Sequence, residues 1–163
     1  MKIAQKIIVL VLAFAMILSL TACSKKPIDY KEFKEVMEDK FDYEVEKGAT
    51  SKDIDKKYYA VDEDGDFHVD YTLYEDADDA EDEVEDYLDE IEEAKEDEDF
   101  DGKITKSSSG KYQKIIVNGE HEDWGDMYVV IIRADNMVII AGTDSTKAKR
   151  VDEINKIVKA LGY

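Results

Sequence analysis

The sequence predicts an α+β fold, with a mainly antiparallel sheet of about five strands and three helices in the order α-β-β-α-β-β-β-α. Three stretches place apolar residues at the spacing of one helix face, and the other regular stretches are rich in β-branched and aromatic residues. The residue pairs Asp64-Gly65 and Asp135-Asn136 stand between neighbouring strands. Tight turns of this kind join antiparallel strands, so we expect hairpins at both positions.

The first helix is predicted over residues 30–40. Asp29 is a suitable N-cap, and Glu32 stands three residues later at the capping-box position. One face of this segment is apolar, so it either packs on the sheet, which we favour, or forms a groove for a partner. That face carries Tyr30, Phe33, Val36, Met37 and Phe41. The residues that follow, 41–45, are compatible with a short extended piece.

Two strands are predicted next, over 57–61 and 67–74, with a tight turn at Asp64-Gly65 between them. Glycine supplies the positive φ that such a turn requires. Alternate residues of the second strand share a face. One face carries Phe67, Val69, Tyr71 and Leu73. We expect the other face to be solvated, and it carries His68, Asp70, Thr72 and Tyr74.

The middle of the chain is strongly acidic. Between Glu75 and Asp101 there are 18 acidic residues and one basic residue, Lys95. An apolar stripe nevertheless runs through it at helical spacing, which predicts a helix over 78–95. The stripe consists of Ala80, Val84, Tyr87, Leu88 and Ile91.

A meander of three strands is predicted after this helix, over 112–117, 127–133 and 137–141. Residues 107–110 are interpreted as a turn or a flexible loop, and residues 118–126 as a polar loop. The last two strands are apolar on both faces. This pattern is typical of central strands covered on both sides, or of a sheet with one face left for a partner.

The final helix is predicted to begin at a cap, Asp144 or Ser145, and to end near Gly162. Its apolar face is formed by Val151, Ile154, Ile157, Val158 and Leu161.

The N-terminal residues have the pattern of an export signal. Lys2 and Lys6 precede an uncharged apolar run, residues 7–18. This run is shorter than the roughly 20 residues that a membrane-spanning helix needs. It is followed by Leu20-Thr21-Ala22-Cys23, which resembles the lipobox of bacterial lipoprotein precursors.

This resemblance implies that the Cys23 thiol receives a diacylglyceryl group and that the precursor is cut before Cys23. Residues 1–22 are then a cleaved signal peptide, 23–28 a lipidated cysteine with its linker, and 29–163 a single acidic domain anchored at the extracytoplasmic face of the cell membrane. Two acyl chains are enough for stable anchoring. An ordinary secretory signal and a retained transmembrane helix remain the alternatives. Lys25 and Lys26 either contact anionic headgroups or serve as a soluble spacer.

The whole layout is also similar to that of small extracytoplasmic lipoproteins of Gram-positive bacteria, with its acidic middle helix and its C-terminal Leu161-Gly162-Tyr163. This similarity implies no catalytic residues.

The charge of the chain restricts its partners. The full sequence has 22 basic and 41 acidic residues, and the loss of two lysines with residues 1–22 leaves 20 against 41, a net charge of −21. Nucleic acids require a positive surface, so we exclude them. The charge favours cationic peptides, basic proteins or metal ions. Cys23 is the only cysteine, so a lipidated protein has no free thiol and no disulfide.

Residues 97–104 resemble the first eight positions of an EF-hand calcium loop, with Asp97, Asp99 and Asp101 at the alternate ligand positions and Gly102 at the bend. The twelfth position is Ser108, where that family has a bidentate glutamate. The alternative is the frayed end of an acidic helix. Residues 62–66 show a similar pattern, but the glycine falls one place early, so we interpret them as a hairpin turn.

His121 and Trp124 lie in the predicted polar loop and form a weak candidate binding site, either as a metal ligand or as an aromatic platform. No nucleophile, phosphate loop or catalytic constellation is recognisable. The sequence therefore predicts a non-enzymatic binding module for a cationic ligand or partner. The alternative is a low-affinity Ca²⁺-binding lipoprotein that uses Asp97, Asp99 and Asp101; no other cofactor is expected.

Overall fold

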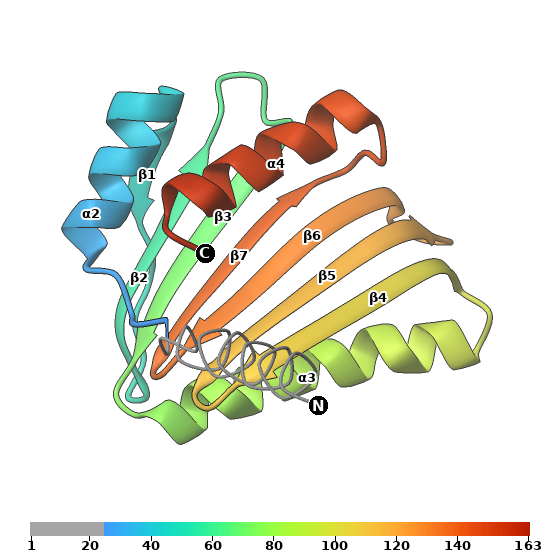
Figure 1. The fold of residues 1–163 in the computed structure, drawn as a ribbon, viewed down its shortest axis with the longest axis horizontal. Helices are drawn as coiled ribbons and strands as arrows, with labels where there is room; N and C mark the ends of the chain where they lie inside the picture. Colours follow the sequence, from blue (N-terminus) through green and yellow to red (C-terminus); the bar gives the residue numbers. More distant parts are fainter. Residues whose placement is uncertain (1–24) are drawn as a thin grey trace, which may run out of the picture.

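A seven-stranded antiparallel sheet forms the centre of the structure, a computed structural model that describes residues 25–163 (Figure 1). The predicted signal peptide and Cys23 lie outside the described residues. The strands follow the order β1-β2-β3-β7-β6-β5-β4 across the sheet. Their bounds are β1 Glu44–Lys47, β2 Ile54–Val61, β3 Phe67–Tyr74, β4 Phe100–Ser109, β5 Tyr112–His121, β6 Gly125–Ala134 and β7 Met137–Thr143.

The α+β class and the antiparallel pairing are confirmed, but the predicted number of strands was too low. The two additional strands are β1 and β4, which form the two edges of the sheet. The prediction of a turn or loop over 107–110 was wrong for Ser107 to Ser109, which belong to β4 and pair with β5. The turn itself is Gly110-Lys111, where Gly110 has a φ of +60°.

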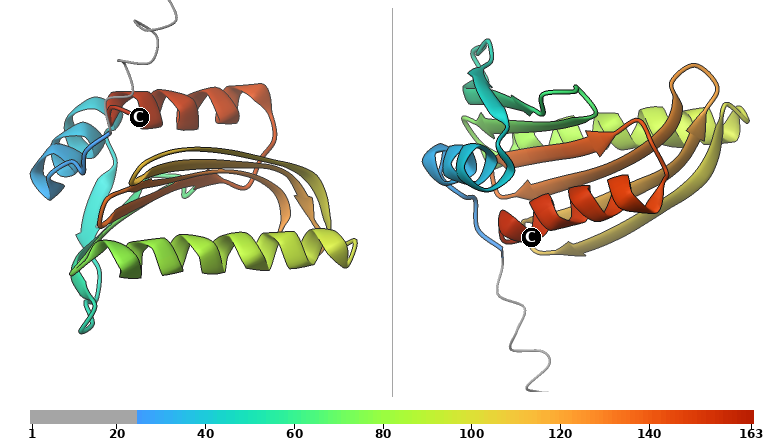
Figure 2. Two further views of the ribbon diagram at one scale, coloured as in Figure 1. Left: turned by 60° about the horizontal axis from the view of Figure 1, so that its bottom comes forward. Right: turned by 90° about the horizontal axis from the view of Figure 1, so that it is seen from above.

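Helices cover both faces of the sheet (Figure 2). One face is covered by α4 (Ala148–Ala160) and by the N-terminal helical segment, which consists of α2 (Tyr30–Glu35) and one π-helical stretch, η1 (Val36–Lys40). The other face is covered by the long acidic helix α3 (Ala77–Glu96). The packing of α2 and η1 on the sheet confirms the interpretation of the first apolar face as a core contact.

Local capping explains where the first two helices begin. The carboxylate of Asp29 accepts a hydrogen bond from the Lys31 N–H, and that of Asp76 accepts from Asp78 and Asp79. The predicted cap of the last helix was wrong, because α4 begins at Ala148 and Lys147 stands at the N-cap position without a side-chain bond.

The expected solvated face of β3 was also wrong in its second half. Thr72 and Tyr74 are each only 6% exposed, because α3 packs over them. Asp70 lies on the same face, half-buried, while His68 is exposed as expected. The apolar stripe of α3 requires a sheet face to cover it, and this face of β3 forms part of that surface.

The polar loop predicted over 118–126 is much shorter in the structure. β5 continues to His121, a three-residue turn follows, and β6 begins at Gly125, where φ is +73°. Backbone pairing with β6 orders these polar residues even though they lack an apolar pattern.

None of the helices in the part of the chain that the structure describes is both long enough and apolar enough to cross a bilayer.

Substitution of Asp70 tests the burial of this face. Burial raises the pKa of Asp70, while His68 and Lys57 act in the opposite direction. The Asp70 carboxyl therefore binds its proton more tightly in the folded state than in the unfolded state. As a result, the free energy of unfolding falls as the pH rises above about 4, the pKa of this carboxyl in the unfolded state. Asp70→Asn should raise the Tm at about pH 7 and leave it nearly unchanged at about pH 3. Thermal denaturation at both pH values measures this.

The matched control is Asp89→Asn, which removes an equal charge from the exposed surface of α3. A gain for Asp70→Asn at neutral pH that is no larger than the gain for this control would contradict the buried position of Asp70.

Candidate functional site

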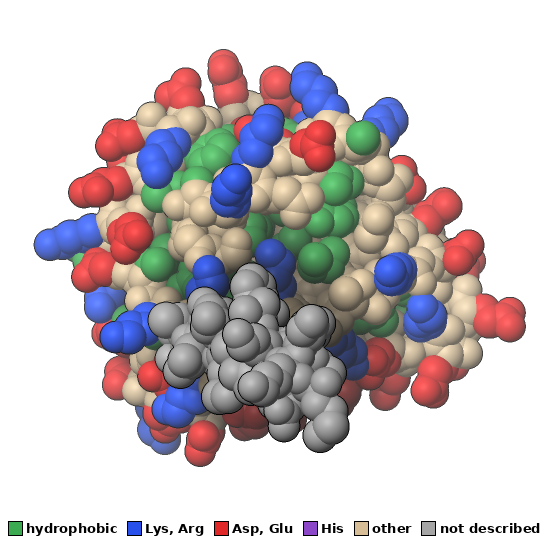
Figure 3. Space-filling view, in the orientation of Figure 1, with side chains coloured by type: hydrophobic (Ala, Val, Ile, Leu, Met, Phe, Trp, Pro, Cys, Tyr) green, Lys and Arg blue, Asp and Glu red, His purple; other side chains and the backbone are tan. Residues whose placement is uncertain are grey.

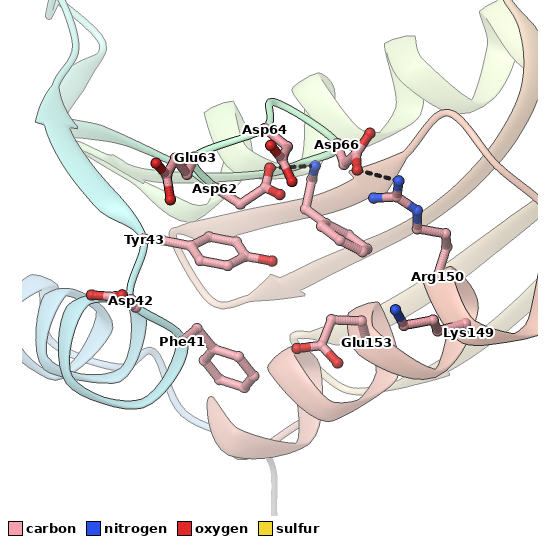
Figure 4. Close-up of a pocket in the computed structure, with 11 residues that line it drawn as sticks. Phe41, Asp42, Tyr43, Asp62, Glu63, Asp64, Asp66, Lys149, Arg150 and Glu153 are labelled. Atoms are coloured by element: carbon pink, nitrogen blue, oxygen red, sulfur yellow. Dashed lines mark hydrogen bonds and ion pairs between the residues drawn. The ribbon is translucent and has the colours of Figure 1, made fainter.

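The turn between β2 and β3 gathers three carboxylates. Asp62, Asp64 and Asp66 each place one oxygen within 4.8 Å of the others (Figure 4). Within residues 25–163 this is the one group of three acidic, histidine or cysteine side chains with the spacing needed to hold a metal ion. Carboxylate oxygens at such spacing suit hard cations and ammonium groups.

The turn geometry explains why these side chains converge. Gly65 has a φ of +72°, and its N–H donates to the Asp62 carbonyl at 3.1 Å. The Asp62 carboxylate also accepts a hydrogen bond of 2.9 Å from the Phe67 N–H, which closes the turn. The hairpin interpretation of residues 62–66 is therefore confirmed. The same turn brings the carboxylates of Asp62, Asp64 and Asp66 together. The early position of Gly65 predicted the turn but did not predict this convergence.

An open pocket of about 590 Å³ lies between this turn, the residues that follow η1, and the first half of α4. Arg150 of α4 forms an ion pair with Asp66, and its guanidinium lies 4.9 Å from the centre of the Phe67 ring. Acidic residues outnumber basic ones around it by six to two. The lining consists of Phe41, Asp42, Tyr43, Asp62, Glu63, Asp64, Asp66, Phe67, Lys149, Arg150 and Glu153.

Tyr43 is the unusual residue of this pocket. Its side chain is only 6% exposed, and its hydroxyl has no hydrogen-bond partner among the described residues. Figure 4 shows the hydroxyl pointing into the space between the turn and α4. Burial raises the pKa of Tyr43. The negative charges of Asp62 and Glu153 raise this pKa further, whereas the positive charge of Arg150 lowers it. The hydroxyl is therefore protonated at neutral pH, and it is available for a hydrogen bond to a ligand in the pocket.

A second acidic hollow, of about 540 Å³, adjoins the first and shares Asp42, Asp62 and Glu63 with it. Its remaining lining is Glu44 and Glu46 of β1 with Tyr59 and Val61 of β2, and it has no basic residue. The exposed Val61, with 40% of its surface accessible, provides an apolar contact beside the acids. The two hollows together form one acidic surface that we call the hairpin pocket.

The structure places Asp97, Asp99 and Asp101 differently from a calcium loop. Asp97 is the C-cap of α3 and donates its N–H to the Glu93 carbonyl, and β4 begins at Phe100. Gly102 pairs with Gly119 of β5 inside the sheet. The chain therefore continues as a strand where a calcium loop would bend, and the three aspartates are not the group whose carboxylates converge.

The structure brings His121 and Trp124 together. Their rings stack with centroids 3.9 Å apart, and Trp124 is 53% exposed. His121 is buried, and its Nδ1 accepts a hydrogen bond from the Asp123 N–H. The imidazole thus stabilises the β5–β6 turn, and the exposed indole is the part that remains available for a contact.

Three comparisons with known proteins gave no match: no family model, no curated protein and no solved structure is significantly similar to this chain. The geometry of the hairpin pocket therefore carries the argument about function.

Replacement of Tyr43 tests whether its hydroxyl lacks a partner in the unliganded protein. Tyr43→Phe removes the hydroxyl and keeps the ring, so the free energy of unfolding without added cation should rise by up to about 1 kcal/mol. Urea denaturation in a chelator measures the change. Tyr128→Phe is the control, because its hydroxyl donates to Asn155 and its loss should destabilise the protein. A loss of stability in Tyr43→Phe as large as in the control would show that the hydroxyl is already satisfied.

Proposed function

We propose that this protein is a non-enzymatic lipoprotein, anchored at the extracytoplasmic face of the cell membrane, that binds a cationic ligand in the hairpin pocket. The observation that carries the binding proposal is the convergence of Asp62, Asp64 and Asp66 near the Tyr43 hydroxyl, which has no hydrogen-bond partner within residues 25–163 (Figure 4). The lipobox resemblance over residues 20–23 supports the anchor.

The pocket contains its own competitor for the ligand. Arg150 neutralises Asp66, while the Asp62 carboxylate is engaged by a backbone N–H. Asp64 is the exposed member of the three aspartates and lies on their solvent side. An incoming cation must therefore bind Asp62 and Asp64 and displace the Arg150 guanidinium from Asp66, which keeps the affinity modest and the binding reversible.

The adjoining hollow extends the acidic surface towards β1 without any basic residue. A ligand with more than one positive charge, such as a basic peptide, can therefore contact both hollows, whereas a metal ion occupies the three aspartates alone.

Calorimetric titration with Ca²⁺ tests the pocket with the simplest probe. Asp64→Asn should weaken binding by about tenfold, because one of three charged ligands becomes neutral. Arg150→Gln should strengthen binding, because the competing cation is removed. Asp99→Asn is the matched control in the alternative site and should have no effect. Loss of binding in Asp99→Asn but not in Asp64→Asn would place the cation in the loop after α3, and heat that disappears at physiological salt in every variant would reject a specific site.

A separate substitution tests the anchor. In cells that make the precursor and are fed a labelled fatty acid, Cys23→Ser should abolish the labelling of the protein, because no thiol remains to carry the diacylglyceryl group. Immunoprecipitation and mass spectrometry measure this, and Ser24→Ala is the control that leaves the thiol in place. Equal labelling of both variants would reject Cys23 as the site of lipidation.

A further inference from the structure

The first described residues are hydrogen-bonded to the C-terminal residues of the chain. Lys25 donates from its Nζ to the Gly162 carbonyl, and the Tyr163 hydroxyl donates to the Lys26 carbonyl at 2.6 Å. The Tyr71 hydroxyl, in the middle of β3, donates to the Ile28 carbonyl at 3.0 Å. The segment that the sequence marks as a linker is therefore bound to the domain at several points.

Aromatic packing adds to these contacts between the two ends of the described chain. The Tyr163 ring stacks on Tyr112 at the start of β5, with 6.1 Å between centroids, and Lys25 lies over the Tyr163 ring. Ile28 also packs against the core that α4 covers. Two peptide units separate Cys23 from Lys25, so their Cα atoms lie at most about 8 Å apart. A lipid on Cys23 would hold this end of the domain directly at the bilayer surface.

The helices on the two faces of the sheet differ strongly in charge. Helix α3 carries twelve acidic residues and one basic residue, whereas α4 carries four basic and two acidic residues, and α2 with η1 carries three basic and four acidic residues. The start of the described chain lies on the α4 side of the sheet, away from α3 (Figure 2). Figure 3, which looks onto the α4 side, shows basic side chains over this helix and around the start of the described chain.

Several lysines gather where the chain enters the domain. Burial lowers the pKa of Lys114 in β5, and the positive charge of the nearby Lys25 lowers it further. Lys26 is exposed beside Lys25, and Lys159 is exposed in the last turn of α4, where its carbonyl accepts a hydrogen bond from the Gly162 N–H. We call Lys25, Lys26, Lys114 and Lys159 the anchor-side lysines.

We propose that the anchor-side lysines form a membrane-facing surface that contacts anionic phospholipid headgroups, so that the lipoprotein stands in one orientation on the bilayer. This inference rests on the proposed lipid anchor. Anionic headgroups attract lysines that lie within about 8 Å of the surface at physiological salt. The short connection to Cys23 places Lys25 within that range, with Lys26 and Lys114 next to it, and the negative surface potential of the bilayer repels the acidic helix α3.

The hairpin pocket is separated from the anchor-side lysines by the length of α4. Arg150, which lines the pocket, and Lys159 are nine residues apart in α4, which corresponds to about 14 Å along the helix axis. The pocket and the anchor-side lysines therefore lie at opposite ends of α4.

Lysine footprinting tests the orientation. The lipidated protein is extracted in detergent, its acylation at Cys23 is checked by mass spectrometry, and it is reconstituted into vesicles of phosphatidylcholine with or without phosphatidylglycerol. A water-soluble acetylating reagent is added at physiological salt, and each lysine is quantified. The anchor-side lysines should react about fivefold more slowly in the anionic vesicles. Lys52, beside the start of α3, and Lys106, which pairs with Glu92 of α3, should react equally in both.

A pair of charge-matched variants separates a specific surface from net charge. Lys26→Glu with Lys159→Glu should abolish the protection of Lys25 and Lys114, whereas Lys52→Glu with Lys106→Glu should preserve it. Equal labelling in both vesicle types, or protection of Lys52 and Lys106 instead, would overturn the orientation while the anchor stands. An unacylated Cys23 would overturn the proposed anchor, and the orientation with it.

Discussion

The fold depends on covering both faces of the two central strands. In β6, Ile131 and Ile132 point to opposite faces and are 1% and 0% exposed, and Ile139 of β7 is completely buried. A strand that is apolar on both faces is stable only when another element covers each side. This constraint holds α3 against the sheet through its apolar stripe, although the self-repulsion of its acidic side chains opposes compaction. The ion pairs of Arg133 with Glu81 and of Lys106 with Glu92 also connect α3 to the sheet.

The two layers of helices give the domain two electrostatically different sides. The acidic helix covers one face, and the mildly basic α4 lies on the other, next to the residues that lead to Cys23. The hairpin pocket lies at one end of α4, and the chain enters the domain at the other end. The proposed attachment point and the proposed binding surface therefore lie at opposite ends of one helix.

Much of the fold could be predicted because its apolar residues recur at regular spacing. The helical stripes of α3 and α4 and the apolar strands β6 and β7 each show a period in the sequence. β4 could not be predicted in the same way, because its second half is polar and its strand state comes from backbone hydrogen bonds to β5. Its first half also resembled a calcium loop, yet Gly102 lies in the sheet, where the facing Gly119 and the Phe100 ring leave no room for a Cβ atom.

The sequence by itself determined the α+β class, the acidic surface, the β2–β3 hairpin and the lipobox pattern, because each depends on residues close together in the chain. The tertiary structure decided which acidic residues lie close together. Asp97, Asp99 and Asp101 had the better local pattern, but their backbone enters a strand. Asp62, Asp64 and Asp66 converge on a turn, and the rest of their pocket comes from Tyr43 and from α4, more than eighty residues further along the chain. Contacts of such separation leave no periodic trace in a single sequence.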